Sequence, residues 1–402
     1  MTKNGNKIKR FLPYSRQFID QKDIKKVSEV LRKNLITQGP KIASFEKKFA
    51  EYVDVKFAVA CSTGTAALHL SCQALKLGPG KNLLTSPITF VATANCAQFV
   101  GADTHFADID PNTFCISVEA LEKELKKKKI DVVIVVHMSG HPANLDKIYQ
   151  LKKKYNFKLI EDACHALGAF YKNTKIGSCK YSDLSTFSFH PVKSITTGEG
   201  GMITTNSKEI YEHLLKLRNH GMHKIQNDFL NKEMAFDKDG NPNVWYYEMV
   251  DLGFNYRITD MQSALGESQL KKIDKFIKMR RKTAKTYNAG FLKNGLIKTP
   301  SEDSGTKHAY HLYTILIDFE NLGKSRNQII NELKNNNIGA QVLYIPVHLQ
   351  PYYSKKYGFK KGDFPAAEKY YQTCLSLPIF PKIKENEINY VIKKINSIIS
   401  IK

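Results

Sequence analysis

Short apolar runs alternate with segments of helical spacing along the first half of the chain. The apolar runs have the length and content of buried strands and cover residues 57–61, 82–87, 104–108, 132–136 and 159–162. Between the later runs, residues 118–128 and 145–155 carry apolar side chains at helical spacing. Because strands that alternate with helices form mostly parallel sheets with helices on both faces, this pattern predicts an α/β domain.

Helical spacing also flanks this region on both sides. Residues 19–31 and 42–52 predict helices, and the apolar positions from 259 to 291 indicate one long amphipathic helix. A second, smaller α/β unit is expected after it, with strands at 313–319 and 340–343 and helices at 326–335 and 388–399. We therefore predict a large domain over residues 1–265 and a small domain over 266–402, joined by the long helix.

One lysine stands in an unusual sequence environment near the middle of the chain. Residues 184–202 begin as an alternating strand, pass through Pro191 and Lys193, and end in a glycine-rich turn. Apolar neighbours such as Phe189 and Ile195 would partly bury Lys193 and lower the pKa of its amine towards the nucleophilic range. Schiff-base chemistry needs such an amine. The alternative is an ordinary surface lysine on a loop.

A second motif places acidic residues at the end of a buried strand. Glu161 and Asp162 close the apolar run, and His165 follows three residues later. Ligands of parallel α/β sheets bind at the carboxyl ends of the strands. An aspartate for the ring nitrogen and a lysine for the aldehyde are the pair that a pyridoxal phosphate site requires. We therefore expect Lys193 and Asp162 to meet in one site.

The turn after the first apolar run is a candidate phosphate site. Residues 62–65, Ser-Thr-Gly-Thr, separate that run from a helix that begins near Ala66. Free N–H groups and the helix dipole attract anions to such an N-terminus.

Composition narrows the class of protein. The chain has 402 residues, of which 42% are hydrophobic and 25% charged, as in ordinary soluble globular proteins. The net charge of +23 raises the hypothesis of nucleic-acid binding, but the lysines are spread over helical segments, so a solvated surface is favoured and no nucleic-acid partner is expected. Seven cysteines without a CxxC pair indicate free thiols, a reducing compartment and no metal site.

The amino-terminal residues and the apolar runs bear on the expected location of the protein. Residues 1–10 are polar and basic, which argues against a signal peptide, and the apolar runs are too short to span a membrane. We therefore expect a cytoplasmic protein.

Four segments together resemble the DegT/DnrJ/EryC1/StrS family of sugar aminotransferases: residues 35–40, 161–168, 184–202 and 252–260, in the family's order over nearly the whole chain. The resemblance implies a pyridoxal phosphate-dependent aminotransferase of fold type I, similar to aspartate aminotransferase, with a large domain and a smaller C-terminal α/β domain. It implies L-glutamate as amino donor, pyridoxamine phosphate as the second cofactor form, and a UDP-4-keto-6-deoxy sugar as acceptor. The amino-acid sequence of residues 189–193 and 245–257 is most similar to that of the pseudaminic acid branch of the family.

The resemblance also implies roles for the residues around the cofactor ring. Lys193 would bond to the aldehyde and move the proton during the reaction. Asp162 would keep the ring nitrogen protonated, and His165 would lie near the ring oxygen. Phe90 would cover one face of the ring, although a core position is the alternative for this residue.

Further roles concern the phosphate and the sugar. By resemblance, the phosphate is bound by Gly64, Thr65 and Ser188, together with Asn255 of a partner subunit, which implies a homodimer. The alternative for Asn255 is helix capping. Thr37 and Gln38 lie in a turn that lines the sugar pocket in the family.

Several questions stay open at the level of sequence. The polar stretch from His223 to Glu248 is long enough for a lid or a dimer contact, and we assign no role to His348. The acceptor could instead be a bacillosamine or perosamine precursor. The protein could also belong to another functional class, as a regulator that keeps the cofactor site but catalyses no reaction. The presence of Lys193, Asp162 and Ser188 argues against this alternative.

Overall fold

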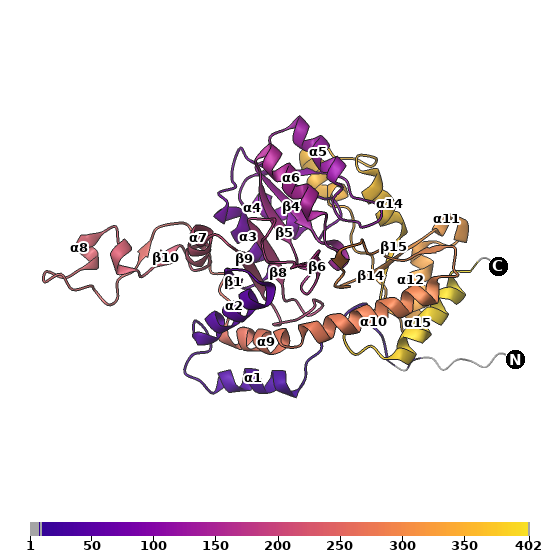
Figure 1. Cartoon of the computed structure of the whole chain (residues 1–402), viewed down its shortest axis with the longest axis horizontal. Coiled ribbons are helices and arrows are strands. Elements are labelled where there is room, and N and C mark those ends of the chain that lie inside the picture. The colour runs from indigo at the N-terminus through magenta and orange to yellow at the C-terminus, as the bar shows by residue number, and fades with distance from the viewer. Residues whose placement is uncertain (1–7, 9, 401–402) are drawn as a thin grey trace.

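A computed structural model describes residue 8 and residues 10–400 of the protein. The segment 1–10, for which the sequence predicts no signal peptide, lies almost wholly outside the described residues. Figure 1 shows a large body around a central sheet, a smaller unit that contains the C-terminal elements, and one arm that projects away from both.

The central sheet has seven strands in the order β1-β9-β8-β5-β4-β2-β3. Neighbours from β8 to β3 pair in parallel, whereas β9 is antiparallel to both β8 and β1. The strands are β1 Phe57–Cys61, β2 Asn82–Thr85, β3 Asp103–Phe106, β4 Val132–Val136, β5 Lys158–Asp162, β8 Leu184–Ser188 and β9 Gly201–Thr205. The prediction of a mostly parallel α/β sheet is therefore confirmed.

Helices cover both faces of this sheet. The alternation of side chains along β4 shows this division, because Val133 and Val135 belong to one core cluster and Val132 and Ile134 to another. The first cluster contains residues of α2 Pro40–Val53, α5 Val118–Lys127 and α6 Leu145–Tyr155. The second contains residues of α3 Gly64–Ala74, α4 Ala92–Phe99 and α7 Lys208–Arg218.

The helix predicted over 259–291 is wrong as a single element. It consists of α9 Asp260–Leu270 and α10 Ile273–Phe291. α9 packs between α1 Gln21–Leu31 and α2, and it buries polar side chains such as Gln269 instead of one apolar stripe. At the break, Lys272 Nζ lies 2.7 Å from Asp23 of α1, and Gln269 donates to the same carboxylate. Because α9 is buried on two sides, the prediction of a helix with one apolar face does not describe it.

The C-terminal part forms a separate sheet and core. Its strands β12 Ile297–Lys298, β14 Tyr313–Ile317 and β15 Cys374–Leu377 pair antiparallel. Its core contains residues of α11 Phe319–Leu322, α12 Arg326–Asn335 and α15 Glu385–Ile398. Of the two other helices in this part of the chain, α13 Pro351–Tyr357 packs with Phe106 of β3, and α14 Pro365–Thr373 contributes to the core of the large body. Leu12, near the amino terminus, packs into this core as well. The domain limits 1–265 and 266–402 remain a prediction.

The strand predicted over 340–343 is wrong. Only Gln341 forms an isolated bridge, to Ser376 of β15. The next residues leave that edge and cross to the large body, where Leu343 and Tyr344 line a cavity. The apolar run at 340–343 connects the two units, so it has no neighbouring strand along its whole length and does not form a strand itself.

The arm consists of the stretch that the sequence analysis singled out after residue 222. Two short strands, β10 Met222–His223 and β11 Glu248–Met249, pair at its base, and α8 Lys232–Ala235 lies further out. The side chain of Trp245 is 72% exposed.

A third small sheet joins β13 Thr306–Lys307 to β6 Phe170–Tyr171 and β7 Thr174–Lys175. Among the described residues, no helix has the length and apolar character that crossing a membrane requires.

An aromatic cluster supports β8 and the segment after it, which carries Lys193. The ring of Phe49 lies 5.0 Å from Phe187 and 5.8 Å from Phe189, and all three side chains are fully buried. We expect Phe49→Ala to lower the free energy of unfolding by about 3–5 kcal/mol, because it removes a ring and leaves a cavity. Urea denaturation measures this loss.

The matched control is Leu292→Ala, since Leu292 is 84% exposed. Its free energy of unfolding should stay within about 0.5 kcal/mol of the parent protein. Equal losses in both variants would show that the cluster is not what holds β8.

Candidate active site

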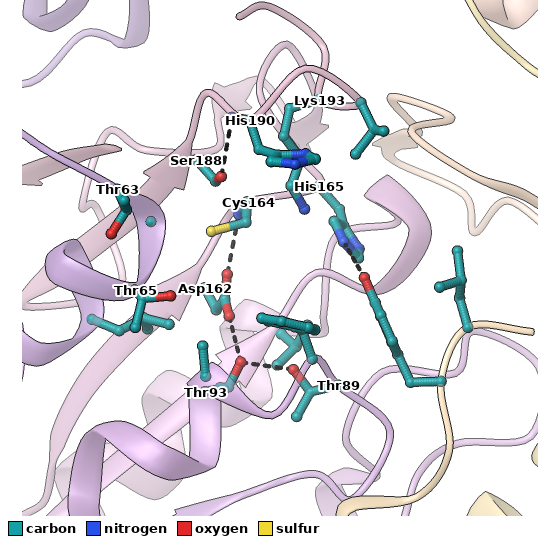
Figure 2. A pocket seen from close by; sticks show the side chains of 18 of the residues that line it. Thr63, Thr65, Thr89, Thr93, Asp162, Cys164, His165, Ser188, His190 and Lys193 are labelled. Atoms are coloured by element: carbon teal, nitrogen blue, oxygen red, sulfur yellow. Dashed lines mark hydrogen bonds between the residues drawn. The ribbon is translucent and has the colours of Figure 1, made fainter. Parts of the chain in front are cut away.

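One cavity of about 470 Å³ opens at the carboxyl ends of the parallel strands. Its lining brings together residues from β5, the loop after β8, the start of α3, the approach to α4, and the segment that enters from the C-terminal unit. Figure 2 shows Lys193, His165, Asp162 and Ser188 around this space. The position agrees with the general rule for ligand sites in parallel sheets.

The carboxylate of Asp162 is buried and oriented by two donors. Asp162 ends β5 and is 5% exposed. The hydroxyl of Thr93 donates to Oδ2 at 2.7 Å, and the backbone N–H of Cys164 donates to Oδ1 at 3.2 Å. The hydroxyl of Thr89 lies 2.7 Å from that of Thr93 and extends the chain of bonds (Figure 2). The carboxylate is therefore held in one orientation.

The neighbouring carboxylate serves a different purpose. Glu161 points to the other face of β5, where His137 Nε2 lies 2.9 Å from one oxygen and the Ser182 hydroxyl 2.5 Å from the other. All three side chains are buried. Strand alternation thus assigns Glu161 to structure and Asp162 to the cavity.

Lys193 lies on a loop between the antiparallel pair β8 and β9. Backbone bonds close this loop at its base, from Phe189 N–H to Gly200 and from Thr197 N–H to Phe189, and Lys193 N–H donates to the carbonyl of His190. The side chain is half-buried. Burial lowers the pKa of the Lys193 amine, while the neighbouring Cys164 and Asp162 act in the opposite direction. A share of the amine is therefore neutral at lower pH than in a solvated lysine.

His165 completes the wall opposite Asp162. It is 5% exposed, and its Nε2 lies 3.2 Å from the hydroxyl of Tyr344. Burial, followed by the positive charge of Lys193, places the pKa of His165 well below its ordinary value. The imidazole is thus a neutral hydrogen-bonding group.

The start of α3 approaches Ser188 closely enough to form a small cradle. A side chain added at Gly64 would place its Cβ 2.7 Å from Ser188 Cβ, so only glycine fits there. Thr63 caps the helix by accepting from the N–H of Ala66 at 3.0 Å. The first N–H groups of the helix, which have no partner within it, lie beside the Ser188 hydroxyl. This is the arrangement in which helix N-termini bind phosphate.

The cavity brings together most of the residues that the sequence singled out. Its lining includes Lys193, Asp162, His165, Gly64, Thr65, Phe90 and Ser188. Phe90 is 54% exposed at the wall, so it is not a core residue. His348, to which the sequence assigns no role, lies 3.1 Å from Glu368 and packs against the ring of Phe364 in the C-terminal part.

Three predicted site residues lie outside this cavity. Thr37 and Gln38 are exposed in a turn that is held to the start of α9, where Asp260 accepts from the N–H groups of Gly39 and Lys41. Asn255 is exposed and bridges to Asn219. Their roles remain predictions.

Sequence reasoning missed several lining residues, notably Tyr14, Thr89, Thr93 and Tyr344. Thr89 and Thr93 have the spacing of one helical turn, which could have indicated a shared face, but nothing in the sequence relates them to Asp162. Tyr344 lies far along the chain from the other residues of the site, and nothing in its local sequence relates it to His165.

The lining fits a phosphorylated pyridine aldehyde. The cradle at Gly64 and Ser188 suits the phosphate, the oriented carboxylate of Asp162 suits a protonated ring nitrogen, and the amine of Lys193 suits the aldehyde. A cavity of about 470 Å³ is large enough for this group.

Comparison with known sequences gives three findings. The model of the DegT/DnrJ/EryC1/StrS aminotransferase family matches residues 17–396. The spore coat polysaccharide biosynthesis protein SpsC of Bacillus subtilis is 38% identical over 98% of this chain and 98% of its own length. The UDP-4-amino-4,6-dideoxy-N-acetyl-beta-L-altrosamine transaminase of Campylobacter jejuni is 38% identical over 94% of this chain and 95% of its own.

Solved structures are similar as well. Helicobacter pylori PseC, described as an aminotransferase in the biosynthesis of pseudaminic acid, superimposes with a TM-score of 0.88 and 30% identity, over 97% of this chain and 99% of its own. The putative sugar aminotransferase Spr1654 of Streptococcus pneumoniae, described in PLP- and PMP-forms, superimposes with a TM-score of 0.85 and 27% identity, over 96% of this chain and 98% of its own.

The lowered pKa of Lys193 predicts a distinct pH dependence of its reactivity. Only the neutral amine reacts with acetic anhydride, so acetylation of Lys193 in the cofactor-free protein should rise at lower pH than acetylation of Lys129, whose side chain is 87% exposed. Competitive labelling with peptide mass spectrometry gives both pH midpoints in one sample. Coincident midpoints would contradict the account of the Lys193 environment.

Proposed function

The chain belongs to the DegT/DnrJ/EryC1/StrS aminotransferase family, and from this premise we propose that it transfers an amino group from L-glutamate to carbon 4 of a UDP-4-keto-6-deoxy-N-acetylhexosamine. The product would be UDP-4-amino-4,6-dideoxy-N-acetyl-β-L-altrosamine. The observation that carries the proposal is the presence of a half-buried lysine amine and an oriented buried aspartate in one cavity.

Family membership settles the general class of the protein. It is a pyridoxal phosphate-dependent sugar aminotransferase, so the predictions of fold type, enzyme class and cofactor are confirmed. The identity of the sugar, the pathway and the cytoplasmic location are finer statements and remain proposals.

The chemistry at the site would divide among few residues. When bound, pyridoxal phosphate supplies an aldehyde that carries the amino group and a ring that accepts electrons. Lys193 Nζ would hold the aldehyde and then take and return the proton that moves during transfer. Asp162, fixed by Thr93, would keep a proton on the ring nitrogen. His165 would lie near the ring oxygen as a neutral partner.

Other residues would hold the cofactor and the sugar in place. Gly64, Thr65 and Ser188 would bind the phosphate at the start of α3. Phe90, exposed at the cavity wall, would lie over the ring and exclude water from it. Thr37 and Gln38 would contact the sugar.

We infer a homodimer as the active form. Asn255 is exposed and outside the cavity of its own chain, as expected if it serves the site of a second copy. The arm exposes apolar side chains that a second copy would cover: Leu230, Met234, Val244, Trp245 and Met249.

The choice of sugar rests on relatives. The altrosamine transaminase has the same identity to this chain as SpsC, 38%, although over a slightly shorter stretch, and PseC gives the TM-score of 0.88. Other acceptors are of bacillosamine or perosamine type, and GDP-perosamine synthase of Escherichia coli is 32% identical. A non-catalytic regulator would bind the cofactor without turnover.

A spectroscopic titration tests the proposal. L-glutamate should convert the loaded protein to its pyridoxamine form, with loss of the long-wavelength cofactor band. UDP-2-acetamido-2,6-dideoxy-β-L-arabino-hexos-4-ulose should then restore the band stoichiometrically, because carbon 4 takes the amino group.

Different failures have different meanings. If glutamate acts but only another nucleotide 4-keto sugar restores the band, the altrosamine assignment falls and the aminotransferase stands. If glutamate and other amino donors leave the band unchanged, transamination itself is contradicted and the regulator is favoured.

A further inference from the structure

The imidazole of His165 is enclosed by groups from the C-terminal part of the chain. The ring of His311 packs against it with centroids 4.4 Å apart, and the hydroxyl of Tyr344 lies 3.2 Å from Nε2. The other ring nitrogen, Nδ1, is buried and has no hydrogen-bond partner among the residues that the structure describes. Tyr344 therefore engages one nitrogen, and the other has no partner among these residues.

Both members of this pair are uncharged. Burial lowers the pKa of His165 strongly, and burial raises that of the Tyr344 phenol. The titratable groups that face the pair, from every element around it, are Tyr14, Asp162, Cys164, Lys193 and His311. A neutral imidazole carries one proton, on either Nδ1 or Nε2. The hydrogen-bond partner of the ring therefore determines which nitrogen is protonated.

Elementary chemistry gives the direction of the bond. A phenol O–H is more acidic than a neutral imidazole N–H, and a bare imidazole nitrogen is more basic than a phenol oxygen. The favoured bond therefore runs from the Tyr344 hydroxyl to Nε2 of His165. The proton of His165 then resides on Nδ1.

Tyr344 is held firmly enough to impose this state. Before it, the hydroxyl of Tyr370 donates to the carbonyl of Leu343 at 2.7 Å. After it, the N–H of Val347 donates to the carbonyl of Pro87 at 2.8 Å. The tyrosine is therefore fixed to α14 on one side and to the large body on the other.

The position of His311 is fixed in a similar way. The buried guanidinium of Arg280 donates to the backbone carbonyl of His311 at 3.1 Å and to those of Tyr310 and Ile379. His165 is thus confined between the ring of His311, whose backbone is held by Arg280, and a hydroxyl that engages Nε2.

We propose that Tyr344 is a positioning residue that fixes His165 in its Nδ1-protonated form, so that the proton of this imidazole has one set location. The consequence for catalysis rests on the proposed function, in which His165 lies near the bound cofactor. The location of the proton on His165 does not depend on the proposed function, because it follows from the residues of this chain alone.

Nitrogen NMR of the cofactor-free protein labelled with ¹⁵N-histidine reads the proton directly. Protonated and bare ring nitrogens have well-separated shifts, and the spectrum of His165→Gln identifies the signals of His165 by their loss. We expect Nδ1 of His165 to be protonated in the parent protein at neutral pH. A proton on Nε2 overturns the proposal without any further variant.

Tyr344→Phe removes the hydroxyl and keeps the ring. The proton of His165 should then be shared between both nitrogens, while Tyr353→Phe, which removes a tyrosine hydroxyl bonded to Asn95 outside the cavity, should leave His165 unchanged. Circular dichroism and thermal unfolding confirm that both variants are folded. An unchanged His165 in folded Tyr344→Phe overturns the proposal.

Kinetics gives a second readout. Tyr344→Phe should lower kcat about tenfold with little change in the KM of the amino donor, as for the loss of one hydrogen bond that orients a group of the site without binding the donor. An equal loss in Tyr353→Phe, or a change confined to KM, contradicts the positioning role. Absence of transamination in the parent enzyme would refute the proposed function and leave the NMR result in place.

Discussion

The site depends on one constraint: a lysine amine and an aspartate carboxylate must be brought out of water together at the edge of a parallel sheet. Asp162 closes β5, and its neighbour β8 leads into the loop that carries Lys193. β9 then returns antiparallel beside β8, which closes that loop over the ends of the strands. Burial lowers the pKa of the lysine amine, and the negative charge of Asp162 acts in the opposite direction.

The C-terminal unit takes part in the site and does more than cover it. Tyr344 crosses from that unit to bond His165, and the hydroxyl of Ser15, on the segment after Leu12, donates to the carbonyl of Val192 beside Lys193. Two groups of the site are therefore set by parts of the chain that pack with the C-terminal core. A shift of that core relative to the sheet would alter both His165 and the lysine loop.

Local patterns in the sequence predict the central sheet and most helices. They also predict those site residues that belong to short motifs. Lys193, Asp162 and the turn at Gly64 could be found because each combines a residue type with a strand end or a helix start. Thr93 and Tyr344 could not, because their roles arise only from distant packing. The break between α9 and α10 arises because contacts on a second side of α9 override the local period, whereas the strand at 340–343 is missing because the chain leaves the edge of β15 after Gln341. The roles of Thr37, Gln38 and Asn255 remain predictions, because all three residues are exposed and lie outside the cavity.

The central claim is that Lys193 is the residue that bonds the cofactor. Borohydride makes the bond between an amine and the cofactor aldehyde permanent, so the loaded protein can be reduced, digested and mapped by mass spectrometry. The account predicts one phosphopyridoxyl group per chain, on the peptide that contains Lys193, and its loss when glutamate is added before reduction. A modification on another lysine, or one spread over many surface lysines, would contradict it.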